Sequence, residues 1–132
     1  MIILCLVVGF LLAAIGLGGY IATGMEHLTA LIPFVIGDLF IAIGLLVKIR
    51  PAWRMHLMHG AATLALLGVL GTINGLLAGF RWLQGTVPAR PPAVLAQSAT
   101  AIILAVFVGL AVRSFIQARI LRETEAAKAA SK

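Results

Sequence analysis

Residues 28–47 read LTALIPFVIGDLFIAIGLLV, and Asp38 is the only charged residue in this stretch. A helix rises ~1.5 Å per residue, so the ten residues from Asp38 to Lys48 extend over about 15 Å. This distance is half of a hydrocarbon layer about 30 Å thick. The stretch therefore predicts a membrane-spanning helix that carries a carboxyl group near the middle of the bilayer.

Three further apolar blocks, each long enough to cross a membrane, occur in the chain. Of the 132 residues, 62% are hydrophobic and 11% are charged, which is more apolar surface than a soluble domain of this size can hide. We therefore predict an all-α integral membrane protein, a single domain whose four transmembrane helices form a bundle. The expected spans are about 2–22, 28–47, 57–80 and 97–117, followed by a cytoplasmic tail, 118–132.

The net charge of +6 comes from basic residues that flank the expected spans, without the interleaved aromatic residues of a nucleic-acid surface. The positive-inside rule predicts that both termini face the cytoplasm, in a bacterial inner or plasma membrane. No Lys or Arg precedes the first block, so we expect a retained span and not a cleaved signal peptide. Eight of the ten basic residues fall on the expected cytoplasmic side: Lys48, Arg50, Arg54, Arg113, Arg119, Arg122, Lys128 and Lys132.

The two least regular parts of the chain are expected outside the spans. Residues 81–96 contain Pro88, Pro91 and Pro92, and this outer loop is where irregular chain or a short re-entrant segment would fit. The fourth helix is expected to continue past the membrane from Ser114, and its Ala- and Lys-rich end to fray in solvent.

Small residues recur at helical spacing in the expected spans, and such stripes let helices approach closely in lipid. They predict a tight four-helix bundle with small-residue packing faces. Alternatively, one stripe, most simply that of the third helix, forms the contact between two subunits of a homodimer. The residues expected at helix contacts are Gly37, Gly44, Gly68, Gly71, Gly75, Gly79, Ala105 and Gly109.

Asp38 directly follows Gly37, so we expect it at the edge of the small face, pointing at or near the bundle interior. A carboxyl group at this depth is buried against protein, paired or kept protonated. It is therefore a candidate proton-binding or substrate-binding group. The alternative is a structural hydrogen bond from Asp38 to another helix, with Asn74, Thr63 or Thr72 as partner. Asn74 is itself either such an interhelical link or part of a polar cavity.

His56, His59 and Arg113 are predicted to lie at the cytoplasmic interface. His56 and His59 are three residues apart, whereas His27 falls on the opposite side, so no haem ligand pair at matched depth is expected. A two-histidine metal site completed by a second subunit remains an alternative. Arg113 is expected to extend its charge toward water, or else to contact an anionic headgroup or substrate. We predict no cofactor, no bound metal and no catalytic apparatus, so the protein is not expected to be an enzyme.

Short glycine-based motifs also resemble a known family. They are Gly19-Tyr20-Ile21-Ala22-Thr23-Gly24 followed by Thr29-Ala30 and Gly37, then Gly79-Phe80-Arg81-Trp82 with Gly85, and Pro92-Ala93. This order is similar to that of small four-helix membrane proteins that include plastid fatty-acid exporters and mitochondrial proteins linked to porphyrin-precursor transport. The chain has one extra residue between Gly24 and Gly37 and a longer outer loop. The resemblance implies movement of a hydrophobic or amphipathic molecule.

Two functions are consistent with these features. The first is a small transporter or exporter, possible as a homodimer, in which Asp38 binds a proton or a cationic group. The second is a non-catalytic accessory or assembly subunit of a larger membrane complex, in which Asp38 and Asn74 are polar contacts. The expected partners are the lipid bilayer and other membrane proteins, not nucleic acid.

Overall fold

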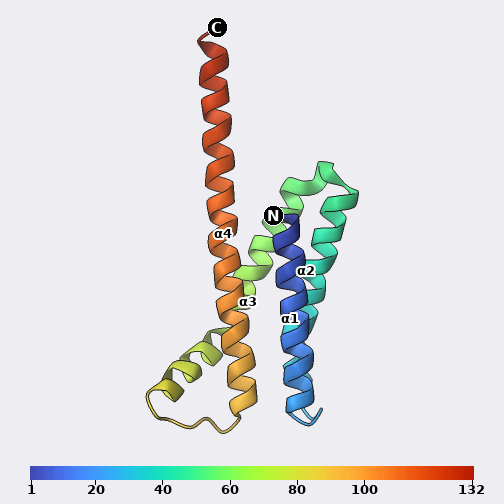
Figure 1. The fold of residues 1–132 in the computed structure, drawn as a ribbon, viewed down its shortest axis with the longest axis vertical. Helices are drawn as coiled ribbons and strands as arrows, with labels where there is room; N and C mark the ends of the chain where they lie inside the picture. Colours follow the sequence, from blue (N-terminus) through green and yellow to red (C-terminus); the bar gives the residue numbers. More distant parts are fainter.

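The computed structural model describes residues 1–132, and nearly all of them are helical. The long helices are α1 (Ile2–Ala22), α2 (Ile32–Ile49), α3 (Arg54–Leu83) and α4 (Pro91–Ala130), with short 3-10 helices η1 (Leu28–Leu31) and η2 (Pro51–Trp53) (Figure 1). Four helical segments are long and apolar enough to cross a membrane. The predicted all-helical class with four spanning helices is confirmed, and the chain fits a multi-pass membrane protein.

Proline and glycine set the helix boundaries. Thr23 Oγ1 donates to the Gly19 carbonyl at 2.9 Å, and Gly24 then adopts a φ of +71°, which a glycine adopts without strain. Pro33 lies in the first turn of α2, where the missing N–H costs little. Pro51 begins η2 directly after α2 has ended, and a proline also begins α4.

The loop between α3 and α4 is shorter than expected. Because α3 continues to Leu83 and α4 already begins at Pro91, residues 84–90 alone lie outside the helices. Pro91 and Pro92 occupy the first turn of α4, which is the position where proline is tolerated best. Irregular chain does occur within the expected outer loop 81–96, but it is limited to 84–90, and no re-entrant helix is present.

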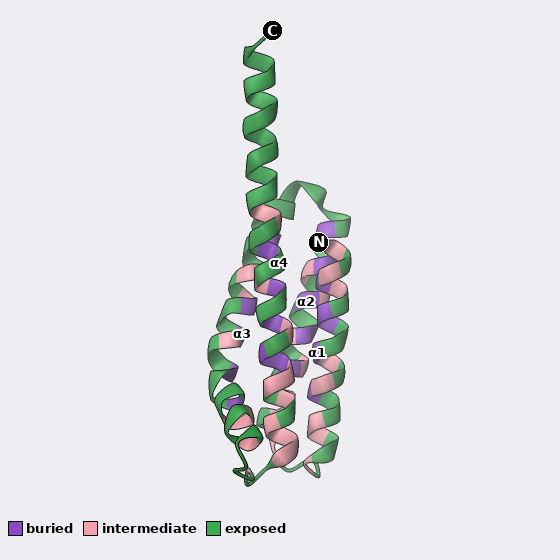
Figure 2. Ribbon diagram, turned by 60° about the vertical axis from the view of Figure 1, so that its left-hand side comes forward, coloured by how far each residue is buried: buried purple, intermediate pink, exposed green.

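The helices form two hairpins. Helix α1 packs chiefly on α2 and α3 chiefly on α4, and the hairpins meet along α1–α4 and α2–α3. Phe40 of α2 and Phe107 of α4 meet at the centre, with ring centroids 4.9 Å apart and planes at 85°. Buried residues follow the inner side of each helix, while the outer faces are exposed (Figure 2). Those faces carry mainly Leu, Ile and Val, as contact with lipid requires.

Helix α4 extends far beyond the rest of the bundle (Figure 1). It stays helical to Ala130, which confirms that the fourth helix continues past Ser114, whereas the expected fraying of its Ala- and Lys-rich end is not found. The segment is rich in alanine, the best helix former, and Arg119 pairs with Glu123 one turn later at 2.9 Å. Met1, η2 and this extension lie at one end of the bundle, which we call the basic end because it carries the eight basic residues named above. The other end is called the far end.

Ser98 makes the only side-chain hydrogen bond between two helices. Its Oγ donates to the Gly75 carbonyl of α3 at 3.0 Å. The other side-chain hydrogen bonds join residues three or four apart in the chain, such as Thr100 Oγ1 to the Ala96 carbonyl at 2.7 Å. Ser98 therefore links α3 to α4 near the far end.

Ser98→Ala is expected to lower the free energy of unfolding by about 0.5–1.5 kcal/mol, because it removes this link and leaves the Gly75 carbonyl without it. The change is measured as the thermal unfolding midpoint in detergent, reported by reaction of a thiol dye with Cys5, the only cysteine, which is buried. Thr124→Ala is the control, since its exposed hydroxyl bonds only to the Ile120 carbonyl of its own helix. Equal midpoints for the two variants would contradict the assigned link.

Candidate functional site

Asp38 lies near the middle of α2, and its side chain is exposed with no hydrogen bond or ion pair. The expected direction toward the bundle interior is therefore wrong. Gly37 faces α1 and Phe40 faces the core, and each residue turns a helix by about 100°. Asp38 is thus about 100° from Gly37 and about 160° from Phe40, which turns its carboxyl group away from the other helices.

The expected polar partners of Asp38 do not form hydrogen bonds with it. Thr63 and Thr72 donate to the carbonyls of His59 and Gly68 in their own helix, at 2.9 Å and 2.7 Å. Asn74 is exposed and makes no side-chain hydrogen bond. It follows the buried Ala65 by nine residues, or about 180°, and so faces outward from α3. The predicted interhelical hydrogen bond of Asp38 with any of these three residues is wrong.

The interior of the bundle is apolar. Its largest buried side chains are Phe40, Phe107, Leu12 and Leu104, and it holds no charged group. The two buried threonines satisfy their hydroxyls within their own helices, and no buried side-chain polar atom is left unpaired. Any polar route past Asp38 therefore lies on the outside of this four-helix unit.

The expected small-residue contacts are present only in part. Gly37 and Gly44 face α1, whereas Gly68, Gly75 and Gly79 face α4. Gly71 and Gly109 are exposed, a Cβ at either would touch nothing within 4 Å, and Ala105 is exposed too. The prediction of helix contacts at these three residues is wrong within the chain.

The interfacial residues lie at the basic end. His56 and Arg113 are exposed without side-chain partners. His59 places Nδ1 2.8 Å from the Met55 carbonyl and stacks on Phe115, with centroids 4.6 Å apart. No three His, Cys, Asp or Glu side chains gather as a metal site would require. The two histidines therefore have different surroundings, and only His59 is held in place by its neighbours.

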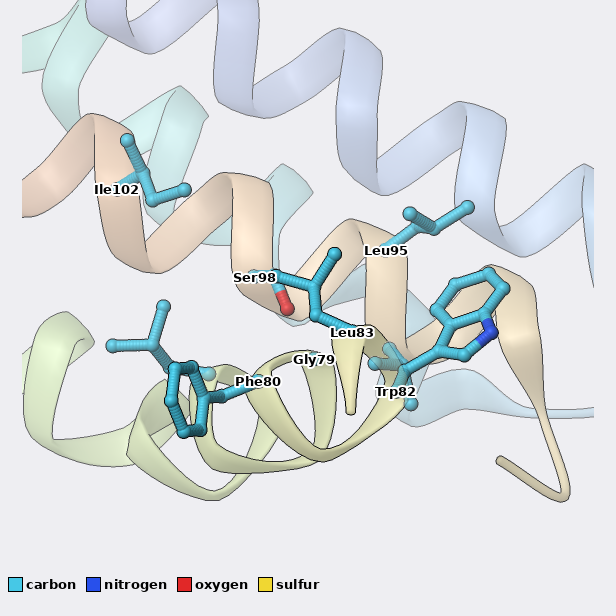
Figure 3. Close-up of a pocket in the computed structure, with 9 residues that line it drawn as sticks. Gly79, Phe80, Trp82, Leu83, Leu95, Ser98 and Ile102 are labelled. Carbon is cyan, nitrogen blue, oxygen red and sulfur yellow. The ribbon is translucent and has the colours of Figure 1, made fainter. Parts of the chain in front are cut away.

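An apolar groove of about 630 Å³ opens between the end of α3 and the start of α4. Figure 3 shows Phe80, Leu83, Leu95 and Ile102 around it, with the Ser98 hydroxyl directed toward α3. Such a groove fits a hydrocarbon chain. It was not predicted from the sequence, because these side chains belong to the outer faces of two helices whose crossing the sequence does not reveal.

Two adjoining pockets of the far end, of about 60 and 260 Å³, share Thr29, Pro33 and Gln97. The larger one lies in the gap between α2 and α3 and reaches Gly71. The exposed Gln97 amide has no hydrogen-bond partner, so it is free to bind the polar part of a ligand. Thr29 and Gln97 were not predicted as site residues, although Gln97 is the only amide at the start of the fourth span.

The sequence-predicted site residues are therefore not gathered into one cavity. Asp38 lines neither the groove, nor the two far-end pockets, nor a further pocket at the basic end, and Asn74 lies on a different helix. What the structure offers is one outward-facing carboxyl group halfway along a spanning helix, together with grooves at both ends of the bundle. Comparison with protein families, with curated proteins and with solved structures found no match.

Proposed function

We propose that the protein is a small transporter of amphipathic molecules that works as an assembly, with its pathway along the outer face of α2. That face is formed by Val35, Asp38, Ala42, Leu45 and Ile49, all exposed. The observation that carries the proposal is the unpartnered Asp38 carboxyl group at half the length of a spanning helix. Asp38 binds the proton or the cationic group of the substrate.

A charged side chain is costly to place in the hydrocarbon layer of a membrane. An ionised Asp at the centre of a spanning helix costs about 2.5–3.5 kcal/mol on insertion scales. The other charged residue of α2, Lys48, lies ten residues or about 15 Å further along the helix and forms no ion pair with Asp38, so nothing in the single chain offsets this cost. The carboxyl group therefore favours either a bound proton or a bound cation, and exchanging one for the other is the elementary step of coupled transport.

A second copy of the chain is the simplest cover for this face. A two-fold contact places the same residues of both copies against each other, so two Asp38 carboxyl groups would face one another. Between them they can hold one proton or one cation, since two adjacent carboxylates repel. This arrangement gives a polar route without opening the apolar interior of either bundle.

The basic residues suggest the orientation. Because eight of the ten lie at the basic end, that end and both termini face the cytoplasm, in a bacterial inner or plasma membrane. The family resemblance carried by the glycine motifs supports transport of a hydrophobic or amphipathic molecule. The groove beside Phe80 and Ile102 supports it too, since it fits an apolar tail.

The proposal is tested by flux in proteoliposomes that enclose a pH-sensitive dye, with an acidic interior and external ethidium as the amphipathic cation. Wild-type protein is expected to raise the internal pH faster than protein-free vesicles do, because protons leave as the cation enters. Dicyclohexylcarbodiimide is expected to block this flux by modifying Asp38. The other acids, Glu26, Glu123 and Glu125, lie outside the expected spans 2–22, 28–47, 57–80 and 97–117, and they serve as internal controls in the mass spectrum.

Failure of the carbodiimide to modify Asp38 in vesicles, or modification that leaves the flux unchanged, would contradict the assigned role. A second candidate function, a non-catalytic assembly subunit, is favoured by the apolar interior and by the exposed extension of α4. It requires a different protein to co-purify in fixed proportion under mild detergent, together with no flux above that of protein-free vesicles.

A further inference from the structure

A pocket of about 680 Å³ lies at the basic end, between η2, the first turns of α3 and the part of α4 around residues 114–122. Three of the residues that line it are Arg54, Arg119 and Arg122. They come from two helices that are distant in sequence, so the fold gathers them. None of them was singled out as a binding residue by the sequence analysis.

The pocket has an excess of positive charge. The lining contains no acidic residue, and the one acid that pairs with a lining residue is Glu123, whose Oε1 accepts from Arg119 Nε at 2.9 Å. That pair is solvent-exposed, with side chains 82% and 64% accessible, so it neutralises little of the charge at the pocket. Arg54 and Arg122 form no ion pair. Two guanidinium groups are thus free to bind an anion.

The lining also has an apolar part that lies deeper, formed by Met58 and Phe115. Met58 is buried in the core, and Phe115 packs against the core and stacks on His59. Along α4, the seven residues from Phe115 to Arg122 extend over about 10 Å. The pocket therefore changes from an apolar floor to a cationic rim over roughly the depth of the headgroup region, which is about 5–8 Å on each side of the hydrocarbon.

We infer that this pocket binds a phosphate-bearing amphipath, the anionic phospholipid of the surrounding leaflet, with its phosphate held by Arg54 and Arg122 and its acyl chain against Met58 and Phe115. A guanidinium fork donates two parallel N–H bonds to phosphate oxygens, a geometry that lysine does not offer. Ser114 also lines the pocket and adds a hydroxyl group. The bilayer supplies this ligand at the depth of the pocket, which favours a lipid over a free anion.

The test is native mass spectrometry of the purified full chain titrated with phosphatidylglycerol or with phosphatidylcholine. Phosphatidylglycerol is expected to bind more tightly. Arg54→Gln or Arg122→Gln is expected to weaken it about fivefold, and both together about 25-fold, because each basic residue near the surface contributes about that factor. Arg113→Gln is the matched control, since Arg113 is an exposed arginine of α4 outside the pocket.

Equal binding of the two lipids, or an Arg54/Arg122 double variant that binds like wild type with Cys5 still protected, would overturn the inference. Inorganic phosphate is added in a parallel arm. Displacement of the lipid by phosphate with the same arginine dependence would keep the phosphate site but assign it to a soluble phosphate. The inference is independent of the proposed transport, so Asp38→Asn is expected to bind phosphatidylglycerol as wild type does.

Discussion

Gly37→Val is expected to separate α1 from α2 and to abolish the native bundle. A Cβ at Gly37 would lie 2.6 Å from the Ala13 nitrogen and 3.2 Å from the Ala13 Cα, and one at Gly9 would lie 2.8 Å from the Gly37 carbonyl oxygen. These neighbours are backbone atoms, which cannot rotate aside as a side chain does. Overpacking typically costs about 1–3 kcal/mol of stability. Because the contacts here are with backbone atoms, we expect the loss of stability to exceed that range.

The change is measured as the rate at which a thiol dye labels Cys5 in detergent, because Cys5 is fully buried in the native bundle. Gly109→Val makes the same chemical change at an open position of α4 and is expected to leave the labelling rate near that of wild type. Rapid labelling of the Gly37 variant alone is the expected result. Slow labelling of both variants would show that the two helices do not pair as closely as described.

Asp38→Asn is expected to reduce ethidium-driven proton flux in proteoliposomes to the level of protein-free vesicles. The amide has nearly the size of the carboxyl group but binds neither a proton nor a cation in its place. Asp38→Glu keeps the carboxyl group one methylene further out and is expected to retain part of the flux. The ordered series of Asp, Glu and Asn therefore reports on the charge and not on the volume of the side chain.

Stability is expected to change little in the same series. Asp38 is exposed and makes no hydrogen bond, so the unfolding free energy of Asp38→Asn should stay within about 0.5 kcal/mol of wild type. Thermal unfolding followed through Cys5 supplies this control. Full flux in the Asn variant would remove Asp38 from the transport mechanism, whereas lost flux with lost stability would identify Asp38 as a structural residue.

The sequence predicted the helices because length and apolar composition decide whether a segment can span a membrane. It did not predict the direction of Asp38, since adjacent residues differ by about 100° and the direction depends on which side the neighbouring helices occupy. The edge of a small-residue face can turn toward lipid as easily as toward protein. The position of the carboxyl group along the helix was therefore predictable, and its surroundings were not.

The helix contacts predicted from small-residue spacing at Gly71, Ala105 and Gly109 were wrong for a related reason. Residues four apart drift by about 40° around a helix, so Ala105 and Gly109 move progressively off the stripe that begins at Ala101. The buried face of α4 instead follows Ala101, Leu104, Phe107 and Ala111, which are separated by steps of three, three and four. Gly68 and Gly75, seven apart, stay against α4, whereas Gly71 turns toward the gap beside α2.

The unbroken course of α4 has a mechanical consequence. Its 40 residues make a rod about 60 Å long, twice the thickness of the hydrocarbon layer. One half is clamped by α3, and the other stands free in solvent. A tilt of only about 5° at the clamped half would displace the free tip by about 5 Å, given that length. Small changes in the tilt of the packed half are thus amplified into larger displacements of the exposed tip.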